Sequence, residues 1–327
     1  SVGLDGVYAS GFTEDLTGRR IRQNMQTVAM VSGAEANKIH MDDQVIGLPP
    51  KGATAIGGGT LGVAASGAQG TNDFVDNSNR LAFVVYPSAL PDADAAAVRD
   101  ALDTTFGVVP PDRNQVVLSG DSILFGGTLI SSLQNRTVTR EIRAKLLGNP
   151  ALYSMALSSQ LLTGPGGMME MAPGREDALA AYGDYAKRIL VVQIGSNDMG
   201  IYGGTPGFSQ TLYATLTDYI NGRRAVGFTH IIACTLLPAA STSGGQHNTE
   251  YLAYNALVRT NGAGADVVLD LAAHPELGSF ANIGDGRYYQ DSLHPTGLGN
   301  SLVATTGGLV GDLPVNYADA INMCLDG

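Results

Sequence analysis

The apolar residues follow two different patterns along the chain. From about residue 111 onward, short apolar runs alternate with longer segments in which apolar residues recur at helical spacing. Such runs predict buried strands, and the recurring spacing predicts amphipathic helices between them. We expect strands at residues 116–118, 151–156, 190–194, 229–237 and 266–270. Because alternating strands and helices pair in parallel through right-handed crossovers, this part should form an α/β domain with a five-stranded parallel sheet and helices on both faces.

The helices of this part are expected between the strands and after the last one. Their ranges are 129–147, 209–223, 249–259 and 296–310, and the clearest run of the first is 140–147, which Gly148 should end. One face of the second helix carries an apolar stripe, which we interpret as core: Leu212, Leu216, Tyr219 and Ile220. The last helix has apolar residues at Leu298, Leu302 and Leu309.

A segment rich in glycine and proline, residues 163–174, interrupts this alternation, and we expect no regular element in it. Long loops near a site often act as lids. Met168, Met169 and Met171 could supply an adaptable apolar wall for a bound acyl or sugar group, or they could pack the loop onto the body of the domain. The sequence leaves both interpretations open.

Residues 1–110 have a different pattern. Short strand candidates at 27–31, 38–41, 44–48 and 81–86 are separated by Gly, Asn, Asp and Pro clusters, which is typical of an antiparallel sandwich. A helix should follow from about residue 93 to 106, with Asp92 as its N-cap. Pro110 and Pro111 cannot continue that helix. We therefore expect a smaller β-rich domain over 1–110 and the α/β domain over 111–327.

Composition and charge narrow the classes of partner. The 327 residues are 44% hydrophobic and 15% charged, as expected of a globular protein with a large core. The formal net charge of −11 argues against nucleic acid or an anionic membrane surface as a partner. No apolar run approaches the length of a transmembrane segment. The chain begins at Ser1 without a signal-like stretch, so we expect a signal peptide to be absent or already removed.

The cysteines and histidines give no sign of a metal or other cofactor. Cys234 lies in an apolar run and should be a buried small hydrophobe. Cys324 lies close to the C-terminus, and whether the two cysteines pair is left open by the sequence. The five histidines are scattered and no Cys-x-x-Cys occurs, so we expect no cofactor. The oligomeric state is also left open.

Three polar segments follow predicted strands or lie in loops. They are Gly-Asp-Ser at 120–122, Gly-Ser-Asn-Asp at 195–198 and Asp-Ser-Leu-His-Pro at 291–295. A turn from strand to helix places a small polar side chain at the carboxyl edge of the sheet, where open α/β sheets have their sites. Each segment alone is an ordinary turn sequence. All three in this order indicate a functional constellation.

Together, these segments resemble those of the SGNH (GDSL-type) hydrolase family, over about residues 114–310. The resemblance implies a flavodoxin-like three-layer fold and a serine esterase without a cofactor. It assigns Ser122 as nucleophile, His294 as base and Asp291 as the acid that orients the base. The oxyanion hole would combine the backbone N–H groups of Ser122 and Ala156 with the side-chain amide of Asn197. Ala156 stands where the family has glycine, and its N–H can serve if its dihedral angles allow.

These assignments agree with the chemistry that ester cleavage needs. A serine hydroxyl is a poor nucleophile unless a base takes its proton, and an acid three residues before the base can fix the tautomer of the base. Asp270 and His274 form a near copy with one more residue between them, but they lack the loop-to-helix context that favours His294.

The remaining polar candidates are given ordinary roles. His40, His230 and His247 should be surface residues or hydrogen-bonded core residues. We expect Asp198 to order a loop and Asp121 to hold the nucleophile turn.

The substrate is inferred from family resemblance. The family acts on lipid, aryl and acetylated carbohydrate esters and on thioesters. The end of the N-terminal part resembles a concanavalin A-like (LamG-type) sandwich, which favours a carbohydrate O-acetyl esterase acting on a small-molecule or glycan ester. The same pairing points to a secreted, extracellular or periplasmic protein, or to one carried on a virion. The alternatives are a small-chain carboxylesterase or lipase, and a non-catalytic glycan-binding or adhesion protein on a degenerate hydrolase fold.

Overall fold

The computed structural model describes residues 28–32, 37–41, 44–48, 112–125, 137–143, 145–181, 185–260 and 262–326, together with single positions between 94 and 101. The chain divides into two compact units, residues 1–111 and 112–327. This division lies one residue from the predicted domain boundary.

The described part of the first unit is a small antiparallel sheet. Strands β1 (Val28–Ser32), β2 (Asn37–Met41) and β3 (Gln44–Leu48) pair in that order. They coincide with three of the predicted strands. The expected strand at 81–86, most of the expected helix at 93–106 and the rest of the proposed sandwich lie outside the described residues. Helical backbone is present at Asp94, Ala97, Val98 and Ala101.

The second unit is built on a five-stranded parallel sheet, as predicted. Its strands are β4 (Asn114–Gly120), β5 (Ala151–Ser154), β6 (Lys187–Gln193), β7 (His230–Cys234) and β8 (Val267–Leu269). They lie in the order β5-β4-β6-β7-β8, and every neighbouring pair is parallel. The strand order therefore reverses beside β4. Ligand sites of open α/β sheets form at such a reversal, outside the carboxyl ends of the strands.

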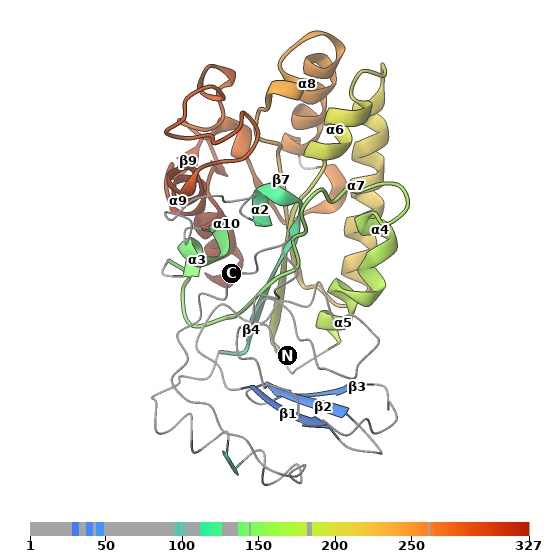
Figure 1. Ribbon diagram of the computed structural model, residues 1–327, viewed down its shortest axis with the longest axis vertical. Helices are drawn as coiled ribbons and strands as arrows, with labels where there is room; N and C mark the ends of the chain where they lie inside the picture. Colours follow the sequence, from blue (N-terminus) through green and yellow to red (C-terminus); the bar gives the residue numbers. More distant parts are fainter. Residues whose placement is uncertain are drawn as a thin grey trace, which may run out of the picture. The chain divides into compact units, whose positions relative to one another are not determined.

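Helices cover both faces of this sheet, which gives three layers (Figure 1). One face is covered by α4 (Met168–Met171), α5 (Glu176–Ala180), α6 (Ser196–Tyr202), α7 (Phe208–Ala225) and α8 (Gly245–Arg259). The other face is covered by α2 (Ser122–Phe125), α3 (Val138–Arg143), α9 (Gly297–Thr305) and α10 (Tyr317–Asp326). The 3₁₀ turns are η1 (Ala172–Gly174), η2 (Ala240–Thr242), η3 (Gly262–Gly264), η4 (Leu271–Ala273) and η5 (Phe280–Asn282), and a hairpin joins β9 (Leu309–Val310) to β10 (Leu313–Pro314).

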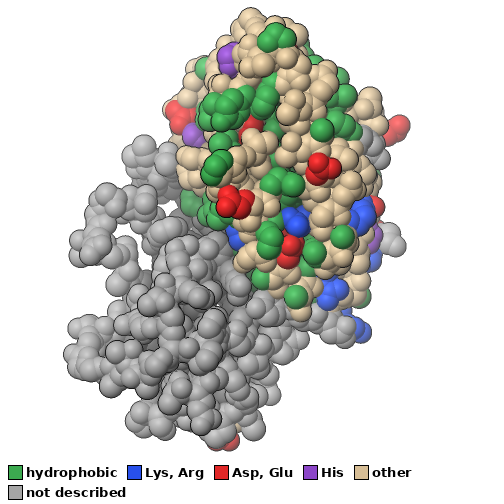
Figure 2. All heavy atoms as spheres, turned by 90° about the vertical axis from the view of Figure 1, so that its right-hand side faces the viewer, with side chains coloured by type: hydrophobic (Ala, Val, Ile, Leu, Met, Phe, Trp, Pro, Cys, Tyr) green, Lys and Arg blue, Asp and Glu red, His purple; other side chains and the backbone are tan. Residues whose placement is uncertain are grey.

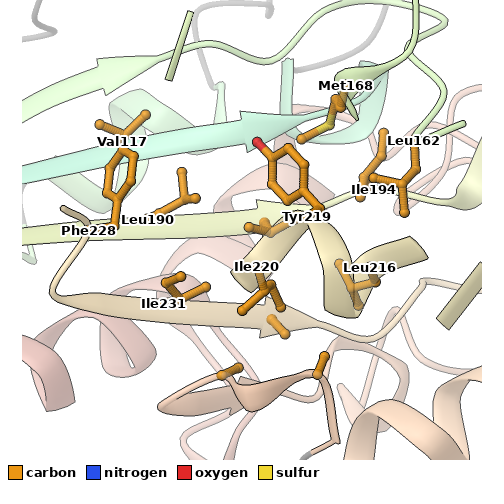
Figure 3. Packing of buried hydrophobic residues seen from close by; sticks show 14 of the residues in the cluster. Val117, Leu162, Met168, Leu190, Ile194, Leu216, Tyr219, Ile220, Phe228 and Ile231 are labelled. Carbon is orange, nitrogen blue, oxygen red and sulfur yellow. The ribbon is translucent and has the colours of Figure 1, made fainter. Parts of the chain in front are cut away.

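The strands bury side chains on both faces because both are covered by helices. Val117, Leu190 and Ile231 pack toward α7, where Figure 3 shows them beside Phe228 and Ile220. The residues before or after them on the same strands pack into a second cluster on the opposite face. The predicted stripe of α7 is confirmed, since Leu212, Leu216, Tyr219 and Ile220 are all buried.

Two helix predictions are wrong in detail, and a third helix was missed. Helix α3 ends at Arg143 instead of reaching residue 147, and the turn after it is tightened because the carbonyl of Ile142 accepts the N–H groups of both Lys145 and Leu146. Helix α9 ends at Thr305, before Gly307 and Gly308. Leu309 therefore lies on β9, where it is exposed at 58%, and Leu298, in the first turn of α9, is exposed at 45%. Helix α10 was not predicted.

The segment 163–174 contains regular structure, which corrects the expectation of a loop without any. It forms α4 and η1, and Met168 is completely buried beside Leu162 and Tyr219 (Figure 3). Met169 is exposed at 40%. The packing interpretation therefore holds for Met168, which cannot also line an open acyl site.

The surface of the second unit is mixed in character. On the face seen in Figure 2, acidic and basic side chains are interspersed, and hydrophobic side chains gather above them. None of the helices in the described ranges has the length and apolarity of a membrane-spanning segment. Within the same ranges, no group of three or more His, Cys, Asp or Glu side chains is arranged to hold a metal ion. Cys234 is buried as expected, and both it and Cys324 are free thiols.

Candidate active site

The site begins at the sharp turn that follows β4. Gly120 lies so close to β6 that a Cβ atom there would stand 2.1 Å from the carbonyl oxygen of Gln193, so only glycine fits. Asp121 then donates its N–H to that same carbonyl at 3.2 Å. Its Oδ1 accepts the N–H of Ile123 at 3.0 Å, which starts helix α2. Ser122 is thereby presented as the first residue of α2, with 5% of its surface exposed.

The structure brings Ser122, His294 and Asp291 together in one hydrogen-bonded row. His294 Nε2 lies 2.8 Å from Ser122 Oγ, and His294 Nδ1 lies 2.7 Å from Asp291 Oδ2. A carboxylate can only accept, so the hydrogen-bond pattern assigns the imidazole proton to Nδ1. Nε2 is then free to accept the proton of the serine hydroxyl. These residues are 172 positions apart in the chain at their widest.

Asp291 and His294 lie on one short loop whose ends are tied together. The N–H of Gln290 donates to the carbonyl of His294 at 2.9 Å, and the N–H of Thr296 donates to the carbonyl of Tyr288 at 2.8 Å. Asp291 Oδ1 also accepts the N–H of His294 at 2.7 Å. The Asp291 carboxylate therefore binds both the ring and the backbone N–H of His294. A separation of three residues between the acid and the base is enough for both contacts.

This loop is anchored to its surroundings through Ser292. Ser292 reverses the chain at a φ of 59°, a left-handed conformation that is uncommon for residues other than glycine. Its carbonyl accepts the N–H of Ala240 at 3.0 Å, which fixes the loop against η2. The residue with the left-handed backbone is thus the same residue that binds the loop to η2.

The carboxylate of Asp291 is only partly shielded from water. The exposed fraction of its side chain is 47%, whereas that of His294 is 15%. Partial burial acts to raise the pKa of Asp291, but the N–H and ring of His294 and the N–H of Leu293 outweigh it, so the pKa is lowered. Asp291 is consequently an anion at neutral pH, as a partner of an imidazolium must be.

Asp121 differs from Asp291 in its burial and in the direction of its pKa shift. It is completely buried, and burial raises its pKa to about 7, against the lowering effect of the Ile123 N–H. The Asp198 carboxylate also contributes to the rise. Ser196 lies beside the Asp121 carboxyl group, yet neither Asp121 Oδ2 nor Ser196 Oγ has a well-formed hydrogen bond within the described residues. Asp121 holds the nucleophile turn, as expected from the sequence.

Replacing Asp121 with asparagine should stabilise the protein in a pH-dependent way. A carboxyl group whose pKa is raised on folding favours the folded state below its unfolded pKa of 3.8, and that contribution is lost as pH rises through about 7. Asparagine keeps the acceptor for Ile123 without a charge. We expect a gain on the order of 2–4 kcal/mol at pH 8 and a small difference at pH 4. Thermal unfolding at both values measures this, and an equal difference at both would contradict the assignment.

Asn197 stands at the start of the neighbouring helix α6. Gly195, at a φ of 115°, turns the chain out of β6 into this helix. The Nδ2 atom of Asn197 donates to the backbone carbonyl of Gln160 at 2.9 Å, which leaves its second proton without an acceptor among the described residues. Because β4 and β6 are adjacent and parallel, α2 and α6 begin side by side at one edge of the sheet. The amide therefore stands at the same edge as Ser122.

Asp198 orders the loop over this edge, as predicted. Its Oδ2 accepts the N–H of Leu162 at 2.9 Å, and its Oδ1 accepts the N–H and hydroxyl of Thr163 at 3.2 and 2.8 Å. The segment that follows β5 is thereby fixed to the first turn of α6. Asp198 forms no hydrogen bond with Ser122 or His294, so a reactive role has no geometric basis.

Ala156, whose N–H the resemblance assigned to the oxyanion hole, lies beyond the last residue of β5. It is completely buried, and its neighbours Met155 and Leu157 still donate to β4, at the carbonyls of Leu118 and Gly120. Strand pairing therefore continues past β5, and the first exposed residues of the loop come later, at Ser158 and Ser159.

The turn itself is made by residues that the sequence reading did not select. Ser158 and Ser159 are exposed, and Ser159 has a φ of 59°, in the left-handed region. The next residue, Gln160, is the one whose carbonyl holds Asn197. A pair of serines after a strand is a turn signal, and this was the available clue to the position of the loop.

The competing pair Asp270 and His274 does not form a site. Asp270 accepts from Thr235 at 2.9 Å and from Arg259 at 2.7 Å. His274 is 2% exposed, its Nδ1 lies 3.3 Å from two backbone N–H groups, and burial lowers its pKa. It is a core histidine, and the preference for His294 is supported by the geometry.

The other histidines stand apart from the triad. His230 Nδ1 lies 2.9 Å from the hydroxyl of Thr229, at the start of β7. His247 lies beside Gly203 and Gly204 at the end of α6.

Comparison with known proteins gives structural resemblance only. No protein-family model matches the sequence, and no curated protein matches it either. A solved structure of a lipolytic G-D-S-L family member from Veillonella parvula matches with 20% identity and a TM-score of 0.46, over 58% of this chain and 93% of that one. An acetylxylan esterase from Geobacillus stearothermophilus matches with 15% identity and a TM-score of 0.44, over 59% and 92%. An α/β hydrolase from the metagenome of Lake Arreo matches with 13% identity and a TM-score of 0.45, over 60% and 93%.

Proposed function

We propose that residues 112–327 form a serine esterase domain that cleaves carboxylic esters through an acyl-enzyme on Ser122. The observation that carries this proposal is the continuous row of hydrogen bonds from Ser122 Oγ through both nitrogens of His294 to Asp291. This arrangement supplies what a serine hydroxyl lacks, namely a base within 3 Å and an anion that holds the base.

The reaction follows from the positions of these groups. His294 Nε2 takes the hydroxyl proton as Ser122 Oγ attacks the ester carbonyl, and a tetrahedral oxyanion forms. Asp291 stabilises the resulting imidazolium through Nδ1–H. The imidazolium then gives its proton to the departing alcohol, which leaves the acyl group on Ser122. A water molecule, deprotonated by the same histidine, completes the cycle by releasing the acid.

The negative charge of the intermediate needs donors on the opposite side of the carbonyl. We assign this role to the backbone N–H of Ser122 and to the unshared amide proton of Asn197. In place of Ala156 we assign the exposed N–H groups of the Ser158–Ser159 turn. The turn is bound to Asn197 through the neighbouring Gln160, so its N–H groups and the Asn197 amide belong to one connected unit.

The substrate class is a further part of the proposal. We favour an O-acetylated carbohydrate, because the N-terminal part has the sequence pattern of a lectin-like sandwich and the catalytic part resembles a family that includes such esterases. An extracellular or periplasmic location rests on the same pairing. A small-chain carboxylesterase is the alternative that the same site chemistry permits, since the triad does not select the alcohol.

Labelling and turnover test this proposal together. A serine-directed fluorophosphonate should modify Ser122 stoichiometrically, as located by peptide mass spectrometry, and His294→Ala should abolish the labelling. p-Nitrophenyl acetate, butyrate and octanoate should be compared with acetylated xylan. Acetate release from xylan, together with a preference for the acetyl ester, supports the carbohydrate esterase. Turnover that is confined to the longer esters supports the alternative. Absence of both labelling and turnover, with measurable glycan binding, would indicate a non-catalytic binding protein.

A further inference from the structure

A chain of buried polar side chains leads from the edge of the sheet to the amide of Asn197. Its central member is Arg175, which precedes α5 and is only 3% exposed. The Arg175 guanidinium donates to the backbone carbonyl of Met155 and to Oε1 of Gln160, the latter at 3.2 Å. It also lies 3.4 Å from the Glu176 carboxylate, which accepts the hydroxyl of Ser119 on β4.

Gln160 connects this arginine to the site. The backbone carbonyl of Gln160 accepts the Asn197 amide at 2.9 Å, and its side-chain amide donates to the carbonyl of Gly166 at 2.8 Å. Gln160 itself is 5% exposed. Arg175 forms no hydrogen bond with Ser122 or His294, so any effect that it has on them passes through Gln160 and the backbone.

The two anchor points of Arg175 lie on either side of the exposed turn. Met155 precedes Ser158–Ser159 and Gln160 follows it, so one planar guanidinium fixes both ends of the turn. Burying an arginine and a glutamate costs desolvation free energy that their attraction often does not return, so stability is a weak reason for the pair. The fixed geometry of the turn is what this arrangement provides.

We propose that Arg175 is a positioning residue for the oxyanion hole, an inference that rests on the proposed esterase function. It sets the turn N–H groups and, through Gln160, the direction of the Asn197 amide. Donors of this kind act on charge that develops in the transition state. Their displacement should therefore lower kcat and leave KM nearly unchanged.

The first test replaces Gln160 with methionine and Arg175 with lysine, with p-nitrophenyl acetate as the substrate. Methionine has a similar length but neither accepts from Arg175 nor donates to Gly166. Lysine keeps the charge beside Glu176 but lacks the planar fork that reaches two carbonyl groups at once. We expect each variant to lose about tenfold or more in kcat, with KM within about twofold of wild type. If one variant does not fold, the other decides the question.

Arg223→Lys is the matched control. Arg223 is also buried, at 8% exposure, and its Nε lies 2.8 Å from the Asp177 carboxylate, but it forms no hydrogen bond or ion pair with residues 155–167. It should lower the melting temperature without changing kcat. If Arg223→Lys and Arg175→Lys reduced kcat equally, a general structural effect would explain both.

A double-mutant cycle on kcat distinguishes a positioning role from a merely structural one, because only a positioning role couples Gln160 to Asn197. If Gln160 acts through Asn197, then Gln160→Met in an Asn197→Ala background should cost much less than it does in the wild type. If the losses in the double variant simply multiply, the route through Asn197 is contradicted. If kcat stays within twofold of wild type in both single variants, the positioning role is overturned. A wild-type protein without esterase activity, or one that stays active as Ser122→Ala, contradicts the proposed function itself.

Discussion

Replacing His294 with alanine is expected to lower kcat for ester hydrolysis by about 10⁴- to 10⁶-fold. The imidazole is the one base in hydrogen-bond contact with Ser122 Oγ among the described residues, at 2.8 Å. Without it the hydroxyl keeps its proton and attacks only slowly. Steady-state turnover of p-nitrophenyl acetate measures the loss. The fold should remain intact because His294 is a partly exposed residue in a loop.

Two further variants make this result decisive. Ser122→Ala should be equally inactive, and the double variant should be no worse than either single one, because the two residues act as a unit. His274→Ala is the matched control from the competing pair. It removes a buried core histidine, so it should lower the melting temperature and leave kcat of the folded enzyme near wild type. Loss of turnover in His274→Ala with an active His294→Ala would reverse the assignment of the base.

Replacing Asn197 with alanine should reduce kcat by about 10²- to 10³-fold with little change in KM. The amide is assigned to a charge that is absent from the bound ester and appears only in the tetrahedral intermediate. Its loss therefore raises the barrier without weakening substrate binding. Measurement of kcat and KM separately is essential, since a damaged binding site would raise KM instead.

Asn322→Ala is a suitable comparison for Asn197→Ala. Asn322 lies on α10, away from the triad, and it also makes two hydrogen bonds, with the N–H of Leu147 at 2.9 Å and the carbonyl of Lys145 at 3.0 Å. Its loss should change stability slightly and leave kcat within about twofold, since surface hydrogen bonds contribute about 1 kcal/mol each. If both variants reduced kcat alike, the amide of Asn197 would have no special role.

The sheet and the triad were predictable from the sequence because their signals are local and strong. Strands buried on both faces read as apolar runs, and each of the three polar segments directly follows such a run or precedes a helix. The parallel order then brings the ends of β4 and β6 together without further information. These positions, together with the resemblance of the three segments to the SGNH hydrolase family, point to Ser122, Asn197 and the Asp-x-x-His loop.

What escaped prediction depended on distances that the sequence does not encode. Ala156 was assigned from the family resemblance, and the sequence does not show that the pairing of Met155 and Leu157 with β4 extends beyond β5 and puts the exposed turn at Ser158–Ser159. The role of Met168 depended on how the segment after Thr163 folds back onto the core. Both are consequences of tertiary packing, which overrides local pattern.

Helix α10 was missed although its signals are present in the sequence. Its buried face carries Tyr317, Ala318, Ala320, Ile321 and Cys324 at helical spacing. Its start is marked as well, because Oδ1 of Asn316 accepts the N–H of Asp319 at 2.9 Å. An asparagine followed by an acidic residue at this spacing is a recognisable helix beginning.

The short closed loop that carries Asp291 and His294 has a consequence for how the site can be switched off. Since both groups belong to a single preassembled body, their mutual alignment survives any displacement of that body as a whole. Only the position of the loop beside Ser122 has to be maintained, and the hydrogen bond between Ala240 N–H and the carbonyl of Ser292 is one contact that holds it there. Loss of this hydrogen bond should move His294 and Asp291 away from Ser122 together. Motion of this segment is therefore not expected to produce a partly active state in which only Asp291 has separated from His294.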